Sequence, residues 1–411
     1  MRLLRLYKDA FAGLQRNIWI LSVAMFINRS GSMVLLFTSL YMTKELHFTI
    51  SQAGMIMSLY GIGSVLGAYL GGWLTDRMNY FNLMLWSLIG CGCILLSMLF
   101  AKTPLTIGMV IFCYPLVGDI FRPANSTAIA AYSTPENRTR SVSLVRLAVN
   151  LGFSVGPAIG GFIALYLGYK WLYVLDAATS LAAAVMLKLY LPKHPPGVTA
   201  GKKEKKRPTS RSAYRDPRYL FFILLVTVYG ICFFQLFSSI PQFFSHDLGY
   251  PEDTIGLLMA LNGALVVLIE MPLILVLEKH RRSFRYIILG ILCLPVAFGI
   301  LLLNREAIFF SVAYTLFITL SEIFAMPFMM NHALSKGPED RKGQYTALHS
   351  IAFGAATIGA PSIGLGIAGA YGFNTLFYVL MGASILLAIG FQLIRERESE
   401  TEKQAEAGIN A

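Results

Sequence analysis

Apolar residues occur along this chain in long runs, which short polar stretches interrupt at fairly regular intervals. A helix needs about 20 mostly apolar residues to cross a membrane, and it satisfies its backbone hydrogen bonds internally where water is absent. Twelve runs are long enough, so we predict an all-α integral membrane protein. The predicted transmembrane helices cover residues 17–42, 52–74, 81–101, 105–132, 141–167, 171–191, 219–244, 254–277, 285–303, 307–333, 344–369 and 373–394.

The second half of the chain repeats the first. Residues 156–176 align without a gap on residues 360–380, and Pro157 falls on Pro361, 204 positions later. Two similar halves of an apolar chain are typical of secondary transporters, in which the substrate path runs between the repeats near the bilayer midplane. The repeat predicts two pseudo-symmetric six-helix bundles and places the candidate site between their helices.

The predicted bundles are joined by a segment of different composition. We predict an N-terminal six-helix bundle at 1–191 and a C-terminal one at 219–394. The intervening residues 192–218 are rich in proline and basic residues and form a predicted cytoplasmic linker. Residues 395–411 mix acidic and basic side chains and are expected to form a disordered tail or a frayed helix.

Lysine and arginine are distributed unevenly between the two sets of loops. Of the 34, 26 lie in the termini and in alternate loops, four in the opposite loops and four within spans. Basic loops stay in the cytoplasm, so both termini are predicted to be cytoplasmic, in a multi-pass protein of the cytoplasmic (inner) membrane. This asymmetry accounts for the net charge of +12, and no nucleic-acid partner is expected.

Composition excludes other classes of protein. Hydrophobic residues make up 56% of the chain and charged residues only 14%, against about 25% charged in a soluble domain. The five cysteines fall inside spans, where apolar packing explains them. The chain has no phosphate loop, no metal-ligand pattern and no Ser/His/Asp arrangement, so we expect neither an enzyme nor a cofactor or metal.

A short motif follows the second span. Gly71-Gly72-Trp-Leu-Thr-Asp76-Arg77 is similar to the loop signature G-x-L-a-D-r-x-G-r-[RK] of the major facilitator superfamily, although Asn79 replaces the later glycine. The six-plus-six helices, the basic central loop and the cytoplasmic termini resemble the same family. The resemblance implies that Gly72, Asp76 and Arg77 act in conformational change, through close helix contact and charge pairing or capping of helix ends.

A second motif lies in the fifth span. The stretch Gly152-x-x-x-Gly156-Pro157-Ala-Ile-Gly160-Gly161 resembles the antiporter signature of the drug and proton exchanging branch of that family. Small residues four positions apart let another helix approach closely, and the proline favours a kink. This similarity favours export, while simple helix packing is the alternative explanation of the motif.

Ionisable residues within the spans are the predicted coupling sites, because each costs roughly 2.5–3.5 kcal/mol at a helix centre. Arg29 and Asp119 lie near the middle of the first and fourth spans, which line the central cavity of the family fold, so we expect them to interact directly or through water. Arg122, one turn beyond Asp119, could compete with Arg29. Glu322 occupies the equivalent place in the tenth span. Because desolvation disfavours a charged carboxyl, Glu322 is the first predicted proton carrier, Asp119 the second and Glu270 a further candidate.

Polar and aromatic residues within the spans complete the predicted site. An aromatic cavity could accept varied shapes, although packing is the alternative role for such side chains. Asp176, near the outer end of the sixth span, is expected to pair locally or to reach the membrane surface. The predicted substrate-binding residues are Asn28, Arg29, Tyr60, Arg122, Phe234, Gln235, Phe324 and His349.

The sequence favours one function and leaves others open. We expect a monomeric secondary active transporter in the lipid bilayer, exporting apolar or amphipathic small molecules in exchange for protons. Proton-coupled uptake of a peptide, sugar or anionic solute is the alternative, although the first span lacks the ExxER pattern of the oligopeptide transporters. A lipid flippase or a sensor that moves no solute is a third possibility.

Overall fold

The computed structural model describes residues 13–31, 33–75, 77–134, 137–192, 212–277, 283–303, 308–336 and 342–409. Within these ranges all regular structure is helical, and twelve stretches are long and apolar enough to cross a membrane. The predicted fold class, an all-α protein with twelve membrane spans, is confirmed. The predicted linker lies largely outside the described residues.

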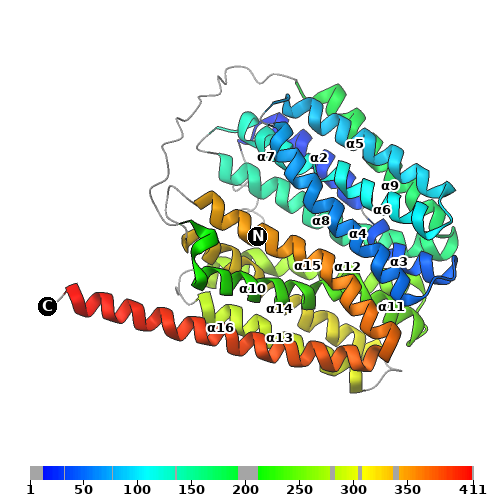
Figure 1. Ribbon diagram of the computed structural model, residues 1–411. Helices are drawn as coiled ribbons and strands as arrows, with labels where there is room; N and C mark the ends of the chain where they lie inside the picture. Colours follow the sequence, from blue (N-terminus) through cyan, green and yellow to red (C-terminus); the bar gives the residue numbers. More distant parts are fainter. Residues whose placement is uncertain are drawn as a thin grey trace, which may run out of the picture. The chain divides into compact units, whose positions relative to one another are not determined.

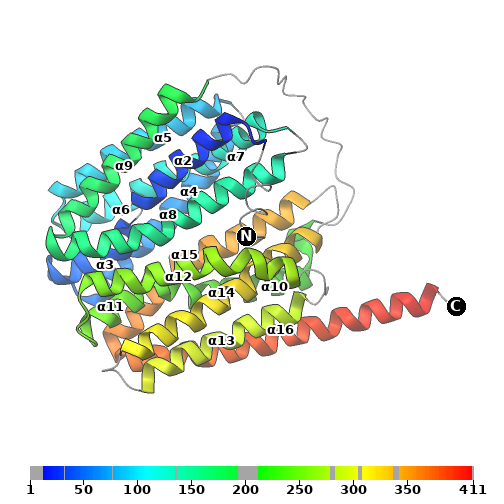
Figure 2. The same cartoon turned by 180° about the vertical axis from the view of Figure 1, so that it is seen from behind.

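The first of two compact units comprises residues 1–48, 55–203 and 244–267. It contains α2 (Arg16–Gly31), α3 (Val34–Lys44), most of α4 (Ile50–Thr75), α5 (Tyr80–Ser97), η1 (Met98–Phe100), α6 (Pro104–Gly118), α7 (Phe121–Tyr132), α8 (Arg138–Tyr166), α9 (Tyr169–Tyr190) and the first part of α12 (Glu252–Leu277). Within it, α2 packs against α8 and α9, and α5 packs against α9, as Figures 1 and 2 show from opposite sides.

The second unit comprises residues 49–54, 204–243 and 268–411. Its other helices are η2 (Ala213–Arg215), α10 (Pro217–Phe233), η3 (Phe234–Phe237), the first part of α11 (Ser239–His246), α13 (Ser283–Leu303), α14 (Ile308–Lys336), α15 (Lys342–Tyr371) and α16 (Phe373–Ile409). Here α13 packs against α14 and α16, and α10 packs against α15. The helix α16 continues through most of the predicted tail. The predicted bundle limits, 1–191 and 219–394, stay a prediction.

Three spans that were expected to be continuous helices are broken. The first divides into α2 and α3 after Gly31, and the fourth into α6 and α7 at Asp119. The seventh passes from α10 through η3 to α11. A tight bond from the Met33 N–H to the Gly31 carbonyl, 2.6 Å long, replaces regular helix pairing at the first break. Each break lies beside a candidate site residue, and discontinuous helices of this kind form binding sites in transporters.

Two equivalent glycines show the repeat in the backbone itself. Gly168 joins α8 to α9 with φ of 92°, and Gly372 joins α15 to α16 with φ of 84°. A residue with a Cβ is strained at such positive φ, whereas glycine is not. Their N–H groups return to Ile163 and Ala368 and so terminate the preceding helices. The same chemistry therefore makes both turns, 204 positions apart.

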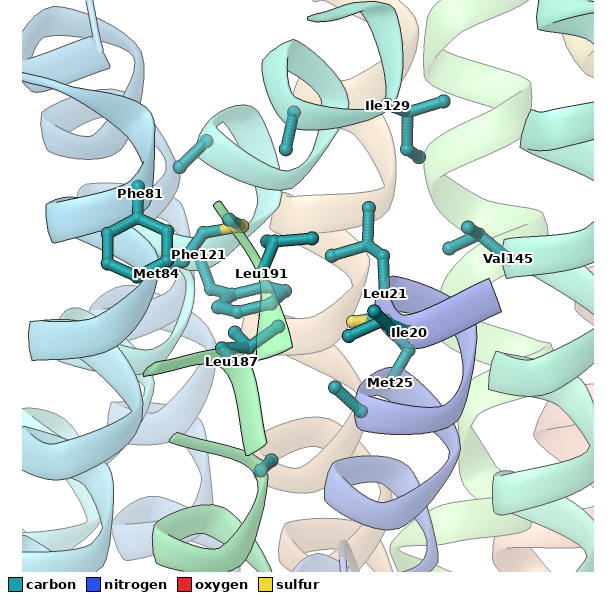
Figure 3. Close-up of a cluster of buried hydrophobic side chains, with 14 of the residues drawn as sticks. Ile20, Leu21, Met25, Phe81, Met84, Phe121, Ile129, Val145, Leu187 and Leu191 are labelled. Atoms are coloured by element: carbon teal, nitrogen blue, oxygen red, sulfur yellow. The ribbon is translucent and has the colours of Figure 1, made fainter. Parts of the chain in front are cut away.

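A hydrophobic cluster fixes the broken fourth span within the first unit. Phe121, which opens α7, is only 3% exposed and packs with Leu21 and Met25 of α2, Met84 of α5 and Leu187 of α9, as Figure 3 shows. Within a membrane, van der Waals packing of this kind, rather than removal from water, stabilises the contact between helices. Because Phe121 lies two residues after Asp119, this packing also holds the break in place.

Candidate functional site

Several predicted residues meet around one small cavity in the first unit. Asn28 and Arg29 come from the end of α2, Tyr60 from α4, and Asp119 from the break between α6 and α7. The cavity holds about 30 Å³, and roughly 10–15 Å³ is enough for a water molecule. In this state the cavity is therefore large enough for water, which can carry a proton, and too small for a drug-sized molecule. Tyr114 of α6 also lines it.

Asp119 is 5% exposed and its carboxylate is fully engaged. One oxygen lies 2.7 Å from Nε of Arg122, and the other accepts a hydrogen bond from the hydroxyl of Ser64 on α4. The break positions both groups, since the Arg122 N–H returns to the Asp119 carbonyl. Arg122, rather than the expected Arg29, therefore pairs with this carboxylate in the present structure.

Arg29 lies in the last turn of α2, where a positive charge is favoured by the helix dipole. Its guanidinium carbon lies 5.6 Å from the ring centroid of Phe153 on α8, a cation–π distance. Within the described residues, its guanidinium makes no ion pair or hydrogen bond. Beside it, Asn28 Nδ2 donates to the Ser180 hydroxyl of α9 at 3.3 Å. This end of α2 therefore combines a positive charge with polar groups.

Asp176 of α9 corrects an expectation from the sequence. It was expected near the membrane surface or in a local pair, but it is 0% exposed, and neither carboxylate oxygen has a hydrogen-bond partner among the described residues. It lies against the break in the first span, because a Cβ on Gly31 would be 3.0 Å from its Oδ1. The sequence contained an indication of this position: Asp176 and Ser180 lie one helical turn apart, so they form a polar pair on one face of the span.

The small residues of the fifth span pack α8 closely on the broken first span. A Cβ on Gly152 would lie 2.6 Å from Cβ of Arg29, and one on Gly160 would lie 2.6 Å from Cβ of Met33. A Cβ on Gly156, between them, would lie 3.0 Å from the Ser30 carbonyl. Contacts this short leave no room for a side chain. The stripe therefore holds α8 against both sides of the helix break.

A second face of α8 packs on α12. A Cβ on Gly161 would lie 2.9 Å from Cα of Asp253, and the Ser154 hydroxyl donates to the Ala260 carbonyl at 3.1 Å. The carbonyl of Pro157 lies against Gly256 of α12. The predicted motif residue Pro157 is thus at a helix contact rather than only at a kink.

The second unit contains the equivalent contact. A Cβ on Gly54 of α4 would lie 2.6 Å from the carbonyl of Pro361 on α15, the residue that the repeat matches to Pro157. It would also lie 2.7 Å from Cβ of Leu365. A glycine against a proline carbonyl therefore recurs in both halves of the sequence repeat.

Sequence reasoning missed an ionic cluster at the ends of three helices in the first unit. Nζ of Lys44, the last residue of α3, lies 2.6 Å from Oε1 of Glu252, the first residue of α12. The Tyr169 hydroxyl at the start of α9 donates to the same oxygen at 2.5 Å. Glu252 is 7% exposed. Because these residues lie at span ends and far apart in sequence, no local motif indicates this helix-end cluster.

In the second unit, Gln235 joins two helices. It is 0% exposed, and its Nε2 donates to the carbonyls of Ile231 and Ala360, each at 3.0 Å. Its Oε1 accepts from the Ser239 hydroxyl at 2.6 Å. The predicted binding residue Gln235 therefore links η3 to α15 in this state.

The other candidates of the second unit are partly or fully buried. Glu322 and Phe324 are half-buried on α14, and Glu270 is 6% exposed on α12. His349 is 6% exposed on α15, where its ring centroid lies 5.2 Å from that of Phe353. Phe234 of η3 packs edge-on against the same Phe353 ring, at 6.1 Å. The structure thus brings Phe234 and His349 around one aromatic side chain.

The loop motif after α4 differs in detail from its expected packing. The close contact is made by Gly71, where a Cβ would lie 2.7 Å from Cα of Ile120, whereas a Cβ on Gly72 would meet nothing within 4 Å. The Arg77 guanidinium carbon lies 3.7 Å above the Trp73 ring. Asp76 lies outside the described residues, so its predicted pairing stays a prediction.

A larger cavity of about 530 Å³ lies in the second unit, at one end of α10, α14 and α16. Aromatic and aliphatic side chains line it, together with the basic residues Arg218, His332 and Lys336. His332 follows Glu322 by ten residues, about 15 Å along a helix. This cavity therefore lies at the helix ends, away from the candidate residues near the middle of the spans.

Known proteins resemble this chain over most of its length. "Uncharacterized MFS-type transporter YttB" of Bacillus subtilis is 25% identical over 401 residues, which cover 95% of this chain and 98% of that protein. "Multidrug resistance protein 1" of the same organism is 24% identical over 58% of this chain and 60% of its own length. Among solved structures, a peptide transporter POT variant superposes with a TM-score of 0.80, at 16% identity, over 94% of this chain and 96% of that one.

The family model agrees with these likenesses. The model of the Major Facilitator Superfamily matches residues 18–361, which include eleven of the twelve predicted spans in whole or in part. The solved structure, at 16% identity, supports the fold alone. With twelve stretches of the described residues able to span a membrane, a repeated pair of proline–glycine contacts and this match, the chain belongs to the Major Facilitator Superfamily of transporters.

Proposed function

We propose that this transporter exports apolar or amphipathic small molecules in exchange for protons, as a monomer in the cytoplasmic membrane with both termini inside. The observation that carries the proposal is Asp119: a carboxylate at a helix break, beside a water-sized cavity and paired with Arg122. A relative named for multidrug resistance supports the direction and the class of substrate.

The proposed step at Asp119 is a competition between a proton and Arg122. When the carboxylate binds a proton, its attraction for the guanidinium falls, and Arg122 and Ser64 are released. Because Ser64 belongs to α4 and Asp119 lies between α6 and α7, release of Ser64 loosens the contact of α4 with this break. Glu322 at the equivalent place in α14 is proposed to act as the first proton carrier, and Glu270 as a further one. Alternating access would then expose the site to each side in turn.

The substrate is proposed to contact the aromatic and polar candidates already described. Phe234, Phe324 and Tyr60 would supply apolar surface, with Arg29 and His349 as polar contacts. Because aromatic rings tolerate varied shapes, such a site suits several related molecules rather than one. The small cavity of this state means that binding requires rearrangement.

The test is proton movement in proteoliposomes that contain a pH-sensitive dye. Lipophilic cations, peptides and sugars are added in turn to wild type, Asp119→Asn, Glu322→Gln and the double variant. Export predicts proton flux opposite to substrate flux, reduced in each single variant and lost in the double one. Glu396→Gln, which changes an exposed acid at the end of the twelfth membrane span, is the matched control and should behave as wild type.

Other outcomes select other functions. Proton and substrate fluxes in the same direction would support uptake, for which Arg29 offers a positive charge to an anionic solute. In that case Arg29→Ala should weaken the binding of ligands that carry a carboxylate. Full proton-driven transport in the double variant would refute the proposed coupling, and absence of solute flux would direct attention to a lipid flippase or a sensor.

A further inference from the structure

We propose that Asp176 is a proton-binding site of this transporter, and that its ionised form pairs with Arg29 across the break in the first span. The proposal takes from the proposed function only the proton as coupling ion. It adds a residue of α9 that neither the motifs nor the cavity around Asp119 includes.

The first argument is the state of the carboxyl itself. Asp176 is 0% exposed, and both of its oxygens are without a hydrogen bond within the described structure. An ionised carboxylate in this position would carry a large desolvation cost with nothing to offset it. Binding a proton removes the charge, so this geometry suits the neutral acid.

Neighbouring hydroxyl groups do not compensate the carboxyl. The Thr179 hydroxyl donates to the backbone carbonyl of Asp176 at 2.9 Å and not to its side chain. The Ser180 hydroxyl accepts from Asn28. Buried polar side chains in proteins are nearly always hydrogen-bonded, and exceptions frequently mark a functional group. Asp176 is therefore a buried acid whose carboxyl group has no hydrogen-bond partner within the described residues.

The second argument is the charge nearby. Arg29 is the charged group that acts on Asp176, and its guanidinium lies over Phe153 without an ion pair in the described part of the chain. The other titratable groups that face Asp176 are Cys91 of α5 and Tyr114 of α6, both neutral in ordinary conditions. Within the described residues, α3 and α8 place no charged group against it.

The third argument is the helix break. Gly31 separates Arg29 from α3 and lies directly against Asp176. An unbroken helix would fix the direction of the Arg29 side chain, whereas a break lets the last turn of α2 rotate. Loss of the proton from Asp176 would then attract Arg29 away from Phe153. A proton at this site would thus control the relation between α2 and α9.

The test is a direct measurement of the protonated carboxyl. Infrared difference spectra of the purified protein are recorded between pH 4 and pH 9 in wild type, Asp176→Asn and Asp119→Asn. We expect a carboxylic C=O band that disappears as the pH rises, is absent in Asp176→Asn and persists in Asp119→Asn. Asparagine has nearly the same shape as aspartic acid, and thermal unfolding checks that the variant is folded.

Arg29 provides the second arm. In Arg29→Met the band should persist to a pH at least one unit higher, because the ionised form has lost its partner. A band that does not depend on Asp176, or one that does not change over the whole pH range, would overturn the proposal. The spectra do not require a substrate, so absence of transport in liposomes would refute the proposed export without affecting this result, and the reverse also holds.

Discussion

The helix-end cluster of Lys44, Tyr169 and Glu252 joins α12 to α3 and α9, and we predict that weakening it opens this contact. We consider Lys44→Met, which keeps a side chain of similar length but removes its charge. Glu252 then keeps the hydrogen bond from Tyr169, but its buried charge loses its counter-ion. A hydrogen bond to a charged group contributes about 1.5–3 kcal/mol, and exposed ion pairs only about 0.2–1 kcal/mol.

The exposure of the pair places the expected effect between those limits. The Lys44 side chain is 40% exposed and that of Glu252 is 9% exposed. Solvent therefore screens the charge of the lysine but not that of the carboxylate. We expect Lys44→Met to destabilise the closed contact of α12 with α3 and α9 by roughly 1–2 kcal/mol. This corresponds to an increase of about 5- to 30-fold in the population in which the contact is open.

A single cysteine reports that population. Ser154 is 8% exposed and packs on α12, so Ser154→Cys should react with a membrane-impermeant thiol reagent only when α8 and α12 separate. The measurement uses a background in which the five natural cysteines are replaced by alanine. The Lys44→Met change should raise the labelling rate from the predicted extracellular side by about 5- to 30-fold.

Two further variants make the result decisive. Lys170→Met removes an exposed lysine at the start of α9 and should leave the labelling rate unchanged. Glu252→Gln should raise the rate, and combining it with Lys44→Met should add little, because both remove one interaction. Equal labelling in Lys44→Met and wild type, or additive effects in the double variant, would show that the ion pair does not hold this contact.

Other predictions test the packing. Gly160→Leu should destabilise the protein by more than 3 kcal/mol or prevent its folding, because a Cβ there would lie 2.6 Å from Met33, whereas Gly72→Leu, with nothing within 4 Å, should change the melting temperature little. Gln235→Leu should cost about 1–3 kcal/mol, since it removes the hydrogen bonds that Gln235 makes with the Ala360 carbonyl and with the buried Ser239 hydroxyl, and thermal unfolding in detergent measures it. A melting temperature of Gln235→Leu equal to that of wild type would contradict the structural role.

The hydropathy pattern predicts the fold because a continuous apolar run of about 20 residues satisfies its backbone in lipid by forming a helix. It does not predict the broken spans. The break after Gly31 lies against Asp176, which is 145 residues away in sequence and comes close only through packing. The same holds for Glu252, whose partners lie at the ends of two distant helices. Local sequence patterns do not predict contacts between residues so far apart in the chain.

The candidate site was predictable only as a set of residue types. Arg29 and Asp119 were chosen from their depth in the spans and Tyr60 as an aromatic residue, and the structure brings them, with Asn28, around one cavity. Their pairing could not be derived from depth. Arg122 lies three residues from Asp119 and reaches it locally, whereas Arg29 would have to cross from α2. Arg29 and Arg122 carry the same charge, so their distance from Asp119 along the chain decides which of them pairs with it.

The glycine stripe of α8 gives these separate features a common mechanical basis. Gly152 packs on α2 before the break, and Gly160 packs on Met33 after it, so one straight face of α8 supports both parts of the first span. Without that support, a break in a membrane helix would expose backbone groups to lipid at a high cost. The stripe therefore permits the discontinuity, and the discontinuity leaves Arg29 beside Asp176 in a position to respond to its charge. In the proposed mechanism, the motif of the fifth span would therefore support proton binding at Asp176 through the first span, in addition to its contact with α12.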